Sequence, residues 1–211
     1  MNATPLKAID RVVWIKCALW PLLLAPALRL VWLMFLVQSG REPNALGADP
    51  IAYLTHQTGD WAAYCLGASL AMTPLRRLSG WAPWIRLRRL LGLFAFFYAS
   101  LHLGVYAALD LGFDLSHLWA DIVKRPYITV GFSAWLLLLP LAITSTRGMM
   151  RRLGRRWGQL HRAVYLIGVL VLLHYAWLVK ADLTWPIIFA AVFAVLMVLR
   201  WWPAARRRGT G

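Results

Sequence analysis

The chain of 211 residues is 61% hydrophobic and only 15% charged, whereas an ordinary soluble domain is about 45–50% apolar and about 25% charged. This composition excludes a soluble globular enzyme, and several membrane spans of about 20 residues each leave no room for a second, soluble catalytic domain. The formal charge of +15 would indicate nucleic acid binding in a soluble protein, but in a membrane protein it reports orientation. We therefore expect membrane lipid, and no nucleic acid, around this chain.

Six apolar stretches predict an all-α integral membrane protein, a bundle of six transmembrane helices. The predicted spans are residues 12–37, 61–75, 90–109, 128–145, 161–179 and 184–202. The second is short and has Pro74 at its end, so its boundaries are the hardest to place. No internal repeat and no low-complexity linker is evident, so residues 1–211 are expected to form a single domain.

The charges alternate between successive connecting segments. The N-terminus, residues 76–89, residues 147–162 and the tail from Arg200 carry most of the 23 Lys and Arg residues and only Asp10 among the acids. The alternate segments, 38–60, 110–127 and 180–183, carry the other seven acids. By the positive-inside rule, both termini and the two Arg-rich loops are predicted to be cytoplasmic.

Two histidines lie at one predicted depth in the bilayer, where ionisable side chains are costly and indicate function. His102 follows Arg89 by thirteen residues, and His174 follows His161 by the same number. With a rise of 1.5 Å per residue, both lie roughly 20 Å from the cytoplasmic face. Two imidazoles at one depth on two helices are able to bind one metal.

Haem is the metal group that this pair favours. Zinc would need further ligands, and no acid lies near that depth, whereas haem needs two axial imidazoles and an apolar, aromatic pocket. The candidate pocket residues are Leu101, Leu103, Tyr106, Tyr165, Leu173, Tyr175 and Trp177. The alternative is that each histidine is a polar side chain satisfied by a neighbouring helix.

His161 lies among arginines at the cytoplasmic interface, where it is either an electron-carrier ligand or a protonated surface histidine. The matching positions on the third span are Arg88 and Arg89, so a second haem has no obvious partner histidine there. These arginines are candidates for binding haem propionates or a flavin phosphate, and attraction of anionic lipid is the alternative.

The other histidines and the cysteines carry weaker signals. His56 and His117 are expected in solvated outward loops, although His56, near Asp60, is also placed to contact a partner or a quinone. Cys17 and Cys65 lie far apart in apolar stretches and are expected to pack as small apolar residues.

The order and spacing of several short motifs resemble the MsrQ family, haem-binding membrane subunits of the ferric-reductase-like transmembrane group. The motifs are Gly47-Ala48-Asp49-Pro50, His56-Gln57-Thr58-Gly59, Thr73-Pro74-Leu75-Arg76-Arg77, Arg88-Arg89-Leu90-Leu91-Gly92, Leu101-His102-Leu103, Arg125-Pro126-Tyr127, Thr144-Ser145, Leu153-Gly154 with Trp157, Leu160-His161-Arg162 and Leu173-His174-Tyr175. The resemblance covers nearly the whole chain.

The resemblance implies a b-type haem protein of the bacterial inner membrane that passes electrons to a periplasmic molybdopterin-containing methionine sulfoxide reductase, which repairs oxidised proteins. His102, His161 and His174 occupy the positions of the family's haem-ligand histidines. Quinone or a cytosolic flavin reductase is the implied donor, and FMN is a second implied cofactor. The chain itself would then be a non-catalytic electron-transfer subunit.

Two other classes of function remain open at this point. One is a self-contained ferric-reductase-like or oxidase-like transmembrane oxidoreductase. The chain has no G-x-G-x-x-G motif and no long soluble segment for such an enzyme's nucleotide domain. The other is a membrane transporter or assembly factor without redox chemistry, which six basic-inside helices also suit.

Overall fold

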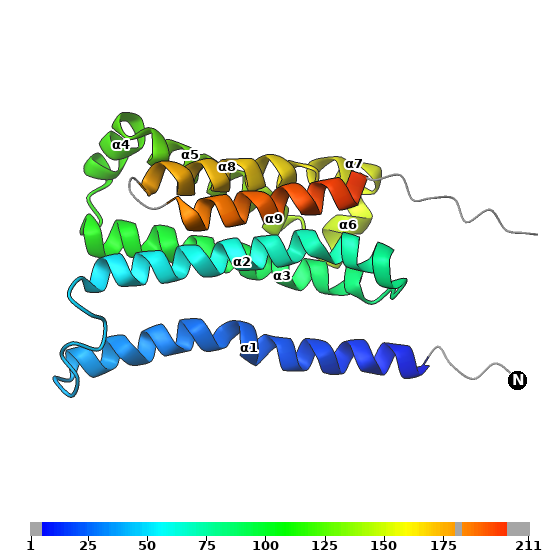
Figure 1. The fold of residues 1–211 in the computed structure, drawn as a ribbon, viewed down its shortest axis with the longest axis horizontal. Coiled ribbons are helices and arrows are strands. Elements are labelled where there is room, and N and C mark those ends of the chain that lie inside the picture. The colour runs from blue at the N-terminus through cyan, green and yellow to red at the C-terminus, as the bar shows by residue number, and fades with distance from the viewer. Residues whose placement is uncertain (1–5, 180–182, 202–211) are drawn as a thin grey trace, which may run out of the picture.

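A computed structural model describes residues 6–179 and 183–201, so the predicted span end at Trp202 and the basic tail beyond it lie outside the described residues. Within those residues the chain is helical and contains no strand (Figure 1). The helices are α1 (Leu6–Gln38), α2 (Pro50–Ser79), α3 (Trp84–Val105), the π-helix η1 (Tyr106–Asp110), α4 (Leu115–Lys124), α5 (Pro126–Ile143), α6 (Arg147–Leu153), α7 (Arg155–Leu160), α8 (Ala163–Leu178) and α9 (Thr184–Trp201).

Five stretches of the described chain are long and apolar enough to cross a membrane. They are Val12–Gln38, Trp84–Asp110, Pro126–Ile143, Arg155–Leu178 and Thr184–Trp201. They correspond to five of the six predicted spans. Helix α2 is not among them, although its 30 residues would be long enough, because polar and charged side chains interrupt its apolar sequence.

Helix α2 differs most from the sequence-based expectation. It begins at Pro50, where the Asp49 carboxylate accepts a hydrogen bond from the Ala52 amide at 2.9 Å. It passes through Pro74 and ends at Gly80, which adopts a left-handed φ of 70°. The prediction of an outward loop around His56 was therefore wrong, because a capped N-terminus extends the helix by about three turns.

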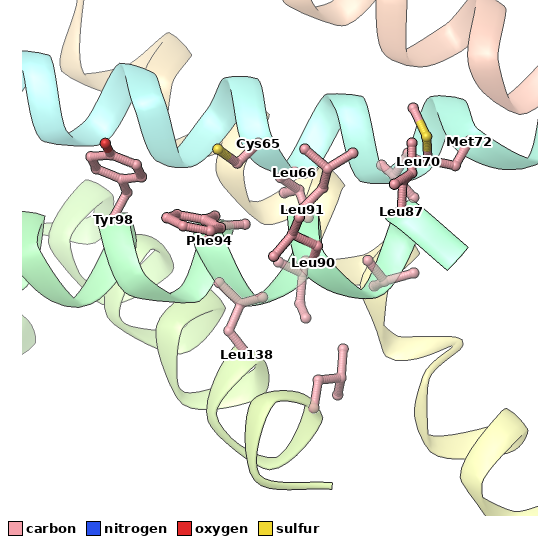
Figure 2. Packing of buried hydrophobic residues seen from close by; sticks show 14 of the residues in the cluster. Cys65, Leu66, Leu70, Met72, Leu87, Leu90, Leu91, Phe94, Tyr98 and Leu138 are labelled. Atoms are coloured by element: carbon pink, nitrogen blue, oxygen red, sulfur yellow. The ribbon is translucent and has the colours of Figure 1, made fainter. Parts of the chain in front are cut away.

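The core lies where α2 and α3 pack against each other and against α5 (Figure 2). Cys65 and Leu70 from α2 meet Leu91 and Phe94 from α3, and all four are buried. Leu138 brings α5 against the same cluster. Cys65 thus packs as a small apolar residue, as expected, whereas Cys17 is exposed.

Tyr98 connects α3 to α1 through two hydrogen bonds to the α1 backbone. Its hydroxyl donates to the Leu23 carbonyl at 2.6 Å and accepts from the Ala27 amide at 3.2 Å. The fully buried Tyr98 therefore links α3 to the turn of α1 that contains Pro26.

The segments predicted to be cytoplasmic gather at one end of the bundle (Figure 1). The start of α1, the α2–α3 connection, the short helices α6 and α7, and the end of α9 all lie there. Helix α4 lies at the other end, where the sequence predicted a loop. The two ends of the bundle therefore differ in charge, as the sequence predicted.

Candidate functional site

His102 and His174 face one another inside the bundle. His102 lies in the last turn of α3, and His174 lies in α8. Their ring centres are 6.1 Å apart and their planes are nearly perpendicular, at 82°. Both line one cavity of about 300 Å³ between α2, α3, α5 and α8. The structure thus brings together two side chains that the sequence placed at equal depth on separate helices.

Each of the two rings is held by a backbone carbonyl of the neighbouring helix. His102 Nδ1 lies 2.9 Å from the Thr55 oxygen, and His174 Nδ1 lies 2.7 Å from the Tyr127 oxygen. A carbonyl oxygen only accepts, so each Nδ1 must carry the proton. The lone pair of each neutral ring therefore lies on Nε2, the nitrogen available to a metal.

A glycine lies against each ring. A Cβ at Gly59 would lie 3.1 Å from His102 Nδ1, and a Cβ at Gly131 would lie 2.7 Å from His174 Nδ1. The second distance is shorter than real side chains tolerate, and the ring cannot retreat without losing its carbonyl partner. Glycine at these positions allows α2 and α5 to approach the imidazoles closely.

The same arrangement therefore occurs twice, which sequence reasoning missed. In α2 and α3, Thr55 and Gly59 hold His102; in α5 and α8, Tyr127 and Gly131 hold His174. Carbonyl and histidine are 47 residues apart in both hairpins. The side chains share little chemistry beyond the glycine and the histidine, so the repeat is one of backbone geometry.

The cavity wall agrees only in part with the predicted pocket. Leu103, Tyr106 and Tyr175 line the cavity. The other four predicted pocket residues do not line it: Leu101, Tyr165, Leu173 and Trp177. Most of the wall is apolar. Residues that the sequence assigned to outward loops also contribute, among them His56 and Asp60 in α2, Asp110 at the end of η1, and Arg125 between α4 and α5. The extension of α2 to Pro50 and the packing of α4 against α5 bring them there.

His161 lies apart from this cavity, in the basic end of the bundle. Its ring stacks on Trp157 with centroids 3.9 Å apart, and its Nδ1 lies 3.1 Å from the Trp157 carbonyl oxygen. Its Nε2 is buried and makes no hydrogen bond to any part of the chain that the structure describes. A buried nitrogen without a hydrogen-bond partner is costly, and the Leu141 backbone also interacts with this ring.

Arg88 and Arg89 lie at the same end as His161. Arg88 is half-buried, and its backbone carbonyl accepts a hydrogen bond from the Ser69 hydroxyl at 3.0 Å. The charge of its side chain acts electrostatically on His161. Arg89 is exposed and stands thirteen residues before His102, as His161 does before His174. Neither arginine lines the cavity of the paired histidines.

The remaining histidine, His117, is exposed at the start of α4. Its Nδ1 lies 3.0 Å from the Asp114 carboxylate, which caps that helix. In residues 6–179 and 183–201 no three His, Cys, Asp or Glu side chains come together as a metal site. A metal group bound by two imidazoles is therefore the arrangement that the described histidines fit.

Comparison with known proteins shows the family of this chain. The family described as "Ferric reductase like transmembrane component" matches residues 58–173. A protein-methionine-sulfoxide reductase heme-binding subunit MsrQ from Xanthomonas euvesicatoria pv. vesicatoria is 50% identical over 204 residues, which cover 97% of this chain and 93% of that protein. The chain belongs to the MsrQ family. A member from Rhodospirillum rubrum is 57% identical over 167 residues, covering 79% of this chain and 80% of its own length.

Membership of the MsrQ family and the five apolar helices make this a multi-pass protein of the bacterial inner membrane. The ferric-reductase-like region contains α3, with His102, and ends one residue before His174. No solved structure matches the chain.

Proposed function

We propose that this chain is the haem-binding membrane subunit of a protein-methionine-sulfoxide reductase and carries electrons across the inner membrane. The observation that carries the proposal is the facing pair His102 and His174, 6.1 Å apart between ring centres. A metal–imidazole bond is about 2 Å long, so two rings at this separation would be able to hold one metal ion between them. The names of the MsrQ relatives support the choice of haem.

The residues present fit a b-type haem. Each Nδ1–H donates to the carbonyl oxygen of Thr55 or Tyr127, so the neutral ring presents its unprotonated Nε2. The mostly apolar wall fits the macrocycle of a haem. His102 and His174 would hold the haem, which would supply reversible one-electron chemistry. The pair therefore suits electron transfer.

We further propose that the chain is one domain of six spans over residues 1–211, with α2 as the sixth span and both termini cytoplasmic. Helix α2 packs along α3 for its length, so α3 and α9 shield it from lipid. Its polar side chains then face protein and the cavity rather than hydrocarbon. The basic end of the bundle is the cytoplasmic end by the positive-inside rule.

Electrons would enter at the basic end or from quinol in the membrane, and would leave at the end that carries α4. The acceptor is a periplasmic molybdopterin-containing subunit that reduces methionine sulfoxide in oxidised proteins. At the cytoplasmic end, His161 with its buried Nε2 and the cations Arg88 and Arg89 are the proposed contacts for FMN from a flavin reductase, or for a second haem and its propionates.

Absorbance of the purified protein tests the proposal first. We expect a Soret band and split α and β bands on reduction, whereas a colourless protein from haem-replete cells would favour a transporter or assembly factor. Inverted and right-side-out vesicles then test direction. Reduced haem should be reoxidised only when the partner reaches the α4 end. Reoxidation by ferric iron or oxygen alone at comparable rates would instead favour a self-contained oxidoreductase.

A further inference from the structure

Arg125 is the single Lys or Arg among the described residues that line the cavity of His102 and His174. It lies between α4 and α5, two residues before the carbonyl that holds His174. Its side chain is 51% exposed, so it lies at the mouth of the cavity. The motif Arg125-Pro126-Tyr127 thus contributes both a cation and a backbone acceptor to one site.

The guanidinium of Arg125 is held in place before any ligand binds. Its Nε lies 3.2 Å from the Asp121 carboxylate, and its Nη1 donates to the Tyr127 hydroxyl at 3.4 Å. The other oxygen of Asp121 accepts from the Tyr106 hydroxyl. Pro126 follows in the first turn of α5, with Arg125 in an extended conformation. The contacts engage only part of a fork of five donors.

The cavity is mostly apolar, and the charged side chains that line it are the cation Arg125 and the acids Asp60 and Asp110. An anionic ligand is therefore expected to turn its charge toward Arg125 and away from the two acids. A carboxylate inside such a wall is costly unless a cation or several donors meet it. A haem carries two carboxylates on one edge, so that edge is expected to lie toward the mouth. Planar guanidinium groups bind carboxylates with two parallel hydrogen bonds.

We propose that Arg125 binds a propionate of the haem held by His102 and His174, with Asp121 and Tyr127 orienting its guanidinium. This inference rests on the proposed function. It assigns the propionate of this haem to Arg125 rather than to Arg88 or Arg89, because neither of those two arginines lines this cavity. It also gives the haem a defined orientation, with its carboxylate edge toward α4.

The test compares the affinity of the haem-free protein for haem and for haem dimethyl ester, in which both propionates are blocked. The unaltered chain should prefer haem by about tenfold or more, the range of a hydrogen-bonded ion pair. Arg125→Gln should bind both forms equally. Lys124→Gln, which removes the neighbouring exposed cation, should keep the preference. An equal preference in Arg125→Gln and the unaltered chain would overturn the inference.

The midpoint potential of the bound haem tests whether the charge of Arg125 acts on the haem or whether the Arg125–Asp121 pair only supports the local structure. Arg125→Gln and Asp121→Asn both break the same pair. Removing the cation should lower the potential, because the added electron loses a favourable charge, and removing the anion should raise it. Shifts of the same sign in both variants would indicate a structural role only. Failure of the unaltered chain to bind either form of haem would overturn the proposed function itself.

Discussion

The two ends of the bundle hold histidines in different surroundings. At the α4 end, His102 and His174 come from two hairpins of the same backbone design and face each other across a cavity. At the basic end, one hairpin supplies His161 and the other supplies Arg89 at the corresponding position. Two helices thus complete a two-imidazole site at one depth only. The repeated hairpin provides positions for ligands, and the side chains decide which positions are used.

The largest effect is expected from removing a histidine of the pair. His102→Ala or His174→Ala should abolish or severely reduce the haem of the α4 end, because a single imidazole remains. Haem per protein and the reduced α band measure this. His161→Ala is the matched control at the basic end and should leave that band in place. A normal spectrum in both His102→Ala and His174→Ala would contradict the assignment.

Alanine at the two close glycines should have a smaller, graded effect. Gly131→Ala places a Cβ 2.7 Å from His174 Nδ1, and Gly59→Ala places one 3.1 Å from His102 Nδ1. The ring must move off its carbonyl, so haem retention in detergent should fall several-fold, and further for Gly131→Ala. Gly67→Ala, with open space around its Cβ, is the control. Equal retention in all three variants would show that the close approach does not position the rings.

Neutralising the basic end should slow electron entry without loss of the haem at the α4 end. The double variant Arg88→Gln and Arg89→Gln removes charge beside His161. We expect severalfold slower reduction by a flavin donor, with an unchanged spectrum of the paired-histidine site. Arg151→Gln with Arg152→Gln removes the same charge from exposed positions in α6. If the two double variants are reduced at the same rate, the arginines at 88 and 89 serve general attraction of lipid or donor.

The smallest effect concerns the cap of α4, at the end of the bundle opposite the basic end. Hydrogen bonds from the Ser116 hydroxyl and from the His117 and Ser116 amides lower the pKa of Asp114 from 3.8 to about 2. A folded pKa below the unfolded value stabilises the helix above about pH 4, and this contribution is lost as the pH falls toward 2.

Amide NMR shifts of Ser116 and His117 in detergent micelles report this cap. They should titrate with a midpoint near pH 2 in the unaltered chain. Asp114→Ser keeps a capping oxygen that does not titrate, so the same shifts should stay constant. A midpoint near pH 4 in the unaltered chain would mean that the cap does not form.

The sequence by itself determined the helical class, the extents of most spans and the depth of the histidines. Apolar stretches of about 20 residues permit little else than helices in a membrane. A fixed rise of 1.5 Å per residue converts the thirteen-residue spacings before His102 and His174 into equal depths. The segregation of arginines into alternate connections is likewise a property of the chain order, and the same segments gather at one end of the fold (Figure 1).

Only the tertiary structure decided which way the side chains face and what holds them. The carbonyls of Thr55 and Tyr127 and the close glycines belong to helices distant in sequence from the histidines they contact. The sequence assigned Arg125 to an outward loop, whereas the packing of α4 against α5 places it at the cavity. Such contacts depend on the rotation of each helix about its axis. That rotation is set by packing between helices, and no spacing within one helix specifies it.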